Sequence, residues 1–124
     1  MTMPLIYIFD HDVDIAFVLT IWLEQNGYRT KGFSTHGELI ASFKYGMPDC
    51  IILDNLYGGL VATKHICDVI QNVFHYKGKI LLSTTGRVTN EEWEDCDAID
   101  FIPKPFHLEQ VLSAVNKAFE NSLA

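Results

Sequence analysis

Short apolar runs alternate along the whole chain with longer segments in which apolar residues recur at helical spacing. The runs at 5–9, 50–53 and 80–82 are continuously apolar, which is typical of strands buried on both faces. A more polar run at 28–33 fits an edge strand, and 98–102 is the last predicted strand. Helices are predicted at 15–23, 36–45, 61–70, 89–96 and 107–123.

This alternation amounts to five strand–helix units. Strands that are apolar on both faces need cover on both faces, and right-handed crossovers place helices there. The pattern therefore predicts an α/β fold with a five-stranded, doubly wound parallel sheet. No linker, repeat or low-complexity tract interrupts the chain, so residues 1–124 are expected to form a single domain. In such sheets the site lies at the carboxyl ends of the strands, near the point where strand order reverses.

Composition narrows the function classes. The 124 residues carry a formal net charge of −7, which argues against a surface built for nucleic acid or anionic lipid. The chain contains no apolar run of membrane-spanning length and no signal-peptide pattern at its start. The three cysteines, Cys50, Cys67 and Cys96, lack metal-site spacing and are expected to be reduced and partly buried. A cytoplasmic protein with no membrane contact and no direct nucleic-acid binding is predicted.

Polar residues stand at the ends of four apolar strands. One is an acidic cluster after the first strand, and the others are a carboxylate, a hydroxyl group and an ammonium group. Since the carboxyl ends of parallel strands share one edge, these side chains are expected to converge there. They are Asp10-His11-Asp12, Asp54, Ser83-Thr84-Thr85 and Lys104.

The chemistry of this set follows from its charges. Neighbouring carboxylates repel one another, and a hard divalent cation with oxygen ligands, Mg²⁺ above all, relieves the repulsion. A carboxylate held in this way can attack phosphorus and become an acyl phosphate. The new phosphoryl oxygens then need the metal, a hydroxyl donor and a cation around them. Asp54 is the candidate nucleophile, Thr84 the donor and Lys104 the cation.

At these residues the chain resembles the receiver domain of two-component response regulators, of the chemotaxis-regulator type. The resemblance covers essentially the whole chain. It is carried by the acidic cluster after the first strand, "PDCIILD" around Asp54, "ILLSTT" around Thr84 and "AIDFIPKPF" around Lys104. The spacing from Asp54 to Thr84 matches the family without a gap. The resemblance implies a flavodoxin-like (βα)5 receiver fold, with a cis bond between Lys104 and Pro105.

The resemblance also implies a function. Asp54 would accept a phosphoryl group from a histidine kinase or histidine phosphotransfer protein. Mg²⁺, with Mn²⁺ as an alternative, would be held by Asp10, Asp54 and the backbone carbonyl of Leu56. Such a domain is not a metabolic enzyme, because it catalyses only its own phosphotransfer and dephosphorylation.

A signalling route is implied in the same way. Thr84 would turn its hydroxyl group toward the phosphoryl group, and Phe101 would rotate inward. This movement would couple the site to the face made by the fourth helix, the fifth strand and the last helix. A static core position is the alternative for Phe101. The output partner, a separate protein or an attached domain, is not identified by the sequence.

One departure from the family lies at the expected metal site. The usual acidic pair after the first strand is here Asp10-His11. An imidazole suits Zn²⁺ or Mn²⁺ better than Mg²⁺, and a protonated imidazole repels cations. Weaker Mg²⁺ binding is therefore expected, falling further at low pH. His11 itself and Asp12 are additional candidate ligands, although Asp12 can equally cap the following helix.

Two alternatives compete with the switch. A pseudo-receiver would bind partners without being phosphorylated, which the His11 departure favours and the retention of the other site residues opposes. "IYIFDHDVD" also fits the Asp-x-Asp pattern of haloacid-dehalogenase-type phosphatases, with Asp10 as nucleophile and Asp12 as general acid. Against the phosphatase, the expected Gly-Thr after Asp12 and a later acidic pair are missing.

Overall fold

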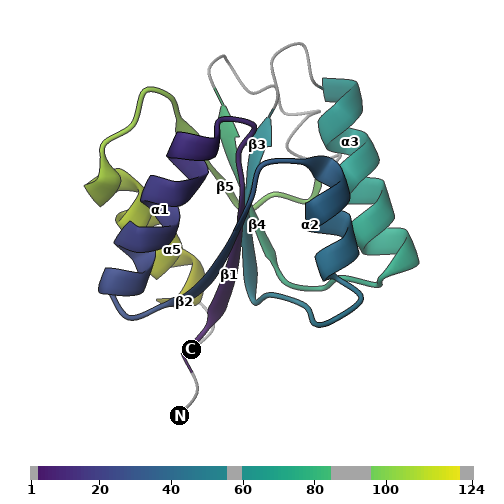
Figure 1. The fold of residues 1–124 in the computed structure, drawn as a ribbon, viewed down its shortest axis with the longest axis horizontal. Coiled ribbons are helices and arrows are strands. Elements are labelled where there is room, and N and C mark those ends of the chain that lie inside the picture. The colour runs from purple at the N-terminus through teal and green to yellow at the C-terminus, as the bar shows by residue number, and fades with distance from the viewer. Residues whose placement is uncertain (1–2, 56–59, 85–95, 121–124) are drawn as a thin grey trace.

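A parallel sheet forms the centre of the molecule (Figure 1). The computed structural model describes residues 3–55, 60–84 and 96–120. The sheet has five strands in the order β2-β1-β3-β4-β5, so the predicted doubly wound topology is confirmed and β2 is an edge strand. Strand order reverses between β1 and β3, which places the expected site there. The strands are β1 (Leu5–Phe9), β2 (Arg29–Phe33), β3 (Cys50–Asn55), β4 (Lys79–Thr84) and β5 (Asp100–Pro103).

Helices cover both faces of the sheet. In Figure 1, α1 (Val13–Gln25) and α5 (Leu108–Glu120) lie on one side of it. On the other side lie α2 (His36–Ser42) and α3 (Leu60–Asp68), the latter continuing as the π-helix η1 (Val69–Val73). The predicted fourth helix, residues 89–96, lies outside the described residues except for Cys96. No helix in the described part of the chain is both long and apolar enough to span a membrane.

Each face of the sheet has its own apolar core. Successive side chains along a strand point to opposite faces of the sheet. Ile6, Ile8 and Ile52 pack under α1 and α5, together with Val111 and Val115 of α5. The opposite core is larger and packs under α2 and α3; its members include Tyr7, Phe9, Leu39, Ile51, Leu53, Ile66 and Leu82. The strands are therefore buried on both faces, as their apolar sequences predict.

Several predicted boundaries need correction. The second helix ends at Ser42 instead of residue 45, because the backbone amides of Phe43 to Tyr45 bond to carbonyls three residues back in a tight turn. β3 continues through Asp54 and Asn55, since both remain paired with β4. The helical spacing of apolar residues over 61–70 predicts His65 on the same face as Ile66 and Ile70, but His65 is exposed.

The helical spacing of apolar residues in the last helix predicts an inner face of Leu108, Leu112, Val115 and Phe119, which the structure confirms in part. Val111 and Val115 are fully buried, while Leu108, Leu112 and Phe119 are partly buried against the same core. The Trp22 indole donates a hydrogen bond of 2.8 Å to the Leu108 carbonyl, which joins α1 to the start of α5.

The three cysteines are free, buried thiols, and one of them makes stability depend on alkaline pH. Burial raises the pKa of Cys50 from 9.0 to about 12, with Lys79 opposing and Asp49 adding to the effect. Above pH 9.0 the unfolded chain releases this proton while the folded chain keeps it. The free energy of unfolding should therefore fall by about 1.4 kcal/mol per pH unit between 9 and 12 from this thiol. Urea denaturation at several pH values on both sides of pH 9 measures this dependence. In Cys50→Ala, the free energy of unfolding should fall less steeply with pH; a fall as steep as in the wild type would contradict the assignment.

Candidate functional site

Two buried carboxylates lie where strand order reverses. Asp10 directly follows β1, and Asp54 is the fifth residue of β3, the strand paired with β1. Their relative exposures are 1% and 2%, respectively. A carboxylate is rarely buried to this extent unless it is paired. The convergence predicted from the strand ends is therefore confirmed for these two residues.

Lys104 is the cation that both carboxylates share. Its Nζ lies 2.8 Å from Asp10 Oδ2 and 3.1 Å from Asp54 Oδ1. The Lys104–Pro105 bond is cis, as predicted, and the Lys104 amide donates to the Thr84 carbonyl at the end of β4. Burial lowers the pKa of Lys104, but the hydrogen bonds and charges of Asp10 and Asp54 outweigh burial and leave this pKa raised. The ammonium is therefore held in its charged form at the site.

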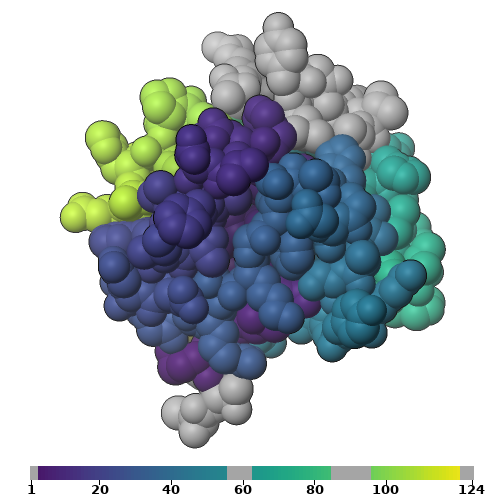
Figure 2. Space-filling view, in the orientation of Figure 1, coloured from purple at the N-terminus to yellow at the C-terminus, as the bar shows by residue number. Residues whose placement is uncertain are grey.

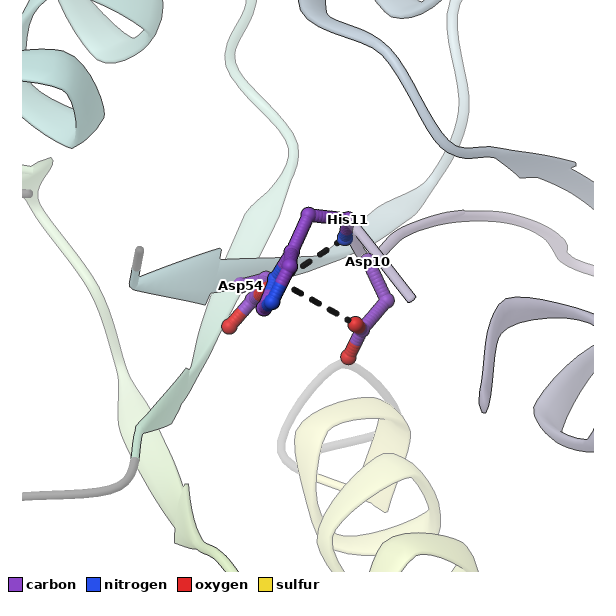
Figure 3. Close-up of side chains that lie close together, drawn as sticks. All are labelled: Asp10, His11 and Asp54. Atoms are coloured by element: carbon purple, nitrogen blue, oxygen red, sulfur yellow. Dashed lines mark hydrogen bonds and ion pairs between the residues drawn. The ribbon is translucent and has the colours of Figure 1, made fainter. Parts of the chain in front are cut away.

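His11 lies against the other oxygen of Asp54. Its Nδ1 is 2.5 Å from Asp54 Oδ2 and 3.7 Å from Asp10 Oδ1. Figure 3 shows the three side chains grouped together. The His11 backbone amide also points to Asp54 Oδ2, at 3.4 Å. The His11 side chain itself is 58% exposed. Asp54 thus has Lys104 on one oxygen and His11 on the other.

Asp12 is a helix cap in this structure. Its carboxylate accepts hydrogen bonds from the amides of Asp14 and Ile15 at the start of α1. Its own amide donates to Asp10 Oδ1 at 2.9 Å. Of the two roles considered for Asp12, ligand or cap, the structure has the cap. Because this carboxylate is turned toward the helix amides, it is also poorly placed to act as general acid for Asp10.

The cap makes a prediction for Asp12→Ala. We expect the variant to lose about 1 kcal/mol of unfolding free energy, the usual value of an N-cap, and to keep its divalent-cation affinity. Urea denaturation and calorimetric titration with Mn²⁺ measure the two effects. Asp14→Ala is the matched control, since Asp14 lies in the same helical turn without capping it. A clear loss of cation affinity in Asp12→Ala would contradict the assignment.

Thr84 and Ser83 end β4 beside Asp54. Ser83 pairs with Asp54 and Thr84 pairs with Asn55 in the register of the two strands, and both hydroxyl residues are buried. Leu81 belongs to the core under α1 and α5, and strand alternation puts Ser83 on the same side of the sheet. The Ser83 hydroxyl has no hydrogen-bond partner among the described residues. The sequence pattern includes Ser83 in the converging set but assigns the hydroxyl donor role to Thr84.

Phe101 of β5 is 38% exposed. It lines a surface groove between β5 and α5, together with Asp100, Gln110 and Lys117. The alternative of a static core position is therefore wrong for this side chain. Leu56, whose carbonyl was predicted to be a metal ligand, lies outside the described residues.

The side chains around Asp54 suit a divalent cation in number and charge. Asp10, His11 and Asp54 each offer one ligand atom, and these atoms lie within 4.8 Å of one another. The two carboxylates outnumber the single ammonium of Lys104, so a negative charge remains to be compensated when the imidazole is neutral. Carboxylate oxygens fit Mg²⁺ or Mn²⁺, while an imidazole nitrogen favours Mn²⁺ over Mg²⁺. The donor set therefore fits a cation held by Asp10 and Asp54.

α1 exposes an apolar stripe next to this site. Val13, Phe17 and Ile21 follow one another at every fourth position and are 63%, 63% and 39% exposed, respectively. Together with Gly32 and Phe33 they line a surface pocket between α1 and β2, on the face turned to the viewer in Figure 2. An apolar stripe of this kind is typical of a surface that meets another protein.

Comparison with known proteins identifies structures with a similar fold. No family model matches the chain, and no curated protein matches it. Among solved structures, a two-component response regulator from Clostridium difficile is 22% identical with a TM-score of 0.84, covering 98% of this chain and 100% of that chain. The chemotaxis protein CheY4 of Vibrio cholerae is 21% identical with a TM-score of 0.79, covering 94% and 99%.

A larger protein matches over one part only. NtrX from Brucella abortus is 22% identical with a TM-score of 0.81; the match covers 98% of this chain and 27% of that chain. At these identities the similarity concerns the fold. The chain has the flavodoxin-like fold of response-regulator receiver domains, as its motifs predict.

Proposed function

We propose that this chain, with its receiver-domain fold, is a phospho-accepting switch of a two-component signalling system. The observation that carries the proposal is the buried Asp54 carboxylate, ion-paired with Lys104 and adjacent to Asp10 at the point where strand order reverses. Buried carboxylates with a specific charge partner cluster at functional sites. The proposal extends to the whole chain as a single receiver domain.

Phosphoryl transfer to Asp54 needs little chemistry from the protein. One Asp54 oxygen attacks the phosphorus of the donor, an O–P bond forms, and the donor's own bond to phosphorus breaks as its leaving group departs with the bonding electrons. Lys104 then neutralises charge on the phosphoryl oxygens, and Thr84 donates a hydrogen bond to one of them. Hydrolysis of the acyl phosphate by water regenerates Asp54. Beyond this self-catalysed cycle, no enzyme activity is proposed.

Asp10 and Asp54 would hold the divalent cation, together with the carbonyl of Leu56. Bound Mg²⁺ or Mn²⁺ would offset the charge that develops on the phosphoryl group. Lys104 binds one oxygen of each carboxylate. The other oxygens, Asp54 Oδ2 beside His11 and Asp10 Oδ1 beside the Asp12 amide, would be the ligand atoms for the cation. The residues of this chain therefore bring the ligands and the acceptor together before any donor arrives.

The partners follow from the same proposal. A histidine kinase or histidine phosphotransfer protein would supply the phosphoryl group, and the apolar stripe of α1 beside Asp10 offers it a surface. Output would pass through Thr84 and Phe101 to the face of β5 and α5, where Phe101 already lines a groove. The recipient of that signal would be a separate protein or an attached output domain.

A pseudo-receiver is the second candidate, because one observation favours it. His11 lies within 2.5 Å of Asp54 Oδ2, so the acceptor is covered on that side. A chain that never takes a phosphoryl group would keep this contact permanently. When cations and a phosphoryl donor are added, the His11–Asp54 contact should break in a phospho-accepting switch and persist in a pseudo-receiver.

Intact mass after incubation with acetyl phosphate tests the proposal. With Mg²⁺ or Mn²⁺ present, we expect one added phosphoryl group, and we expect none when the cation is removed by a chelator. An adduct that does not need a divalent cation would contradict the proposed metal role. No adduct with any divalent cation would favour the pseudo-receiver.

A further inference from the structure

The two oxygens of Asp54 have different partners of different strength. Oδ1 accepts from the Lys104 ammonium at 3.1 Å, whereas Oδ2 accepts from His11 through the side chain at 2.5 Å and the backbone amide at 3.4 Å. The shortest contact in the site is thus made by the most exposed side chain in it, His11 at 58%. An exposed ring that binds a buried oxygen can leave it without disturbing the core.

The direction of the hydrogen bond follows from the chemistry of its partners. Asp54, ion-paired with Lys104, is a carboxylate and can only accept hydrogen bonds. Nδ1 of His11 must therefore carry the proton in this contact. A ring nitrogen that carries a proton has no lone pair to give to a metal. In the arrangement seen here, His11 Nδ1 is not a metal ligand.

The N–H group also lies where a shared cation would have to bind. Nδ1 is 2.5 Å from Asp54 Oδ2 and 3.7 Å from Asp10 Oδ1, so it points between the two carboxylates (Figure 3). A magnesium ion binds a carboxylate oxygen at about 2.1 Å. An ion at this distance from Asp54 Oδ2, on the side of Asp10, would collide with the imidazole. The cation and the imidazole cannot both use Asp54 Oδ2 from this side.

We propose that His11 is a built-in competitor of the divalent cation at Asp54. The inference rests on the proposed function, because the cation is the one that assists phosphorylation there. In the cation-free chain the imidazole covers Asp54 Oδ2, and cation binding swings it out toward solvent. The concentration of divalent cation then sets the fraction of molecules whose acceptor carboxylate is uncovered.

Competition and ligation make opposite predictions for the same variant. If His11 competes, His11→Ala removes a hydrogen bond that must break before the cation binds, and cation affinity rises, by about tenfold for one charge-assisted hydrogen bond. If His11 ligates the cation, the same variant binds more weakly. Calorimetric titration with Mg²⁺ and with Mn²⁺ measures the change. His65→Ala is the matched control, since His65 is an exposed histidine of α3 outside the cluster around Asp54.

Nuclear magnetic resonance of the imidazole provides a second readout on the unmodified protein. We expect Nδ1 of His11 to carry a hydrogen-bonded proton in the cation-free chain, and this hydrogen bond to be lost as Mg²⁺ is added. A His11 ring that keeps the hydrogen bond at saturating Mg²⁺ would overturn the proposal. Weaker or unchanged cation affinity in His11→Ala would overturn it as well.

The outcome for His11 is separate from the outcome for the proposed function. If His11→Ala binds cations more weakly and the protein still takes up a phosphoryl group from acetyl phosphate, the competition is wrong and the switch stands. If the wild type and His11→Ala both fail to bind Mg²⁺ or Mn²⁺ and both fail to be phosphorylated, the competition and the proposed function are both wrong. Tighter binding in the variant, with phosphorylation reached at lower Mg²⁺ than in the wild type, supports both.

Discussion

Replacing Asp54 with Asn is expected to abolish phosphoryl uptake from acetyl phosphate. The amide has nearly the same shape as the carboxylate but no anionic oxygen to attack phosphorus, so no acyl phosphate can form. Intact mass after incubation with acetyl phosphate and Mg²⁺ should show the unmodified chain alone. Asp68→Asn, which removes an exposed carboxylate on α3, is the matched control and should accept phosphate as the wild type does.

A retained adduct in Asp54→Asn would point to another nucleophile. Asp10 is the nearest alternative, because its Oδ2 shares Lys104 with Asp54. The double variant Asp10→Asn with Asp54→Asn would then lose the adduct that the single variant keeps. That result would support the phosphatase-like use of Asp10 over the receiver-like use of Asp54.

Replacing Lys104 with Met is expected to cost about 3 kcal/mol of unfolding free energy, the lower end of values for breaking a buried ion pair. The variant leaves the carboxylates of Asp10 and Asp54, 2% and 3% exposed, without their shared cation. Urea denaturation measures the loss, with the exposed Lys31→Met as control. Because the two carboxylates then repel one another, Mg²⁺ should stabilise Lys104→Met more than it stabilises the wild type.

A double variant tests the cause of this loss. Adding Asp10→Asn to Lys104→Met removes one of the two unpaired charges, so part of the lost stability should return. The two changes should therefore be far from additive, as expected for residues in direct contact. Additive losses, or a loss below about 1 kcal/mol in Lys104→Met, the level of an exposed pair, would contradict the account of a buried shared cation.

The strand ends could be predicted because two simple rules coincide in this chain. Continuous apolar runs marked β1, β3 and β4, and the first polar residue after or within each run proved to lie at the common edge. Asp10, Asp54 and Ser83 were found in this way, and Lys104 was found as the cation that follows the last predicted strand. In the register of β3 and β4, Asp54 pairs with Ser83 and Asn55 pairs with Thr84.

Other features depend on contacts that no local pattern encodes. The side-chain conformation that brings the His11 ring to Asp54 is one of several available, and it depends on contacts that exist only in the folded site. The exposure of His65 and the early end of α2 at Ser42 depend on tertiary packing. The side chains buried in the core are those of the neighbouring Ile66 and Phe43. The role of Asp12 was open between two chemically sensible positions, and the amides of Asp14 and Ile15 decided it.

The most direct test of the account is to locate the phosphoryl group. Loss of the adduct in Asp54→Asn would also follow if Asp54 only held the cation, so the variant alone does not identify the acceptor. Borohydride reduction of the acyl phosphate converts the modified aspartate to homoserine, which peptide mass spectrometry then places in the sequence. We expect homoserine at position 54 after treatment with acetyl phosphate and Mg²⁺. Homoserine at position 10, or at neither position, would contradict the assignment of Asp54 as the phosphoryl acceptor.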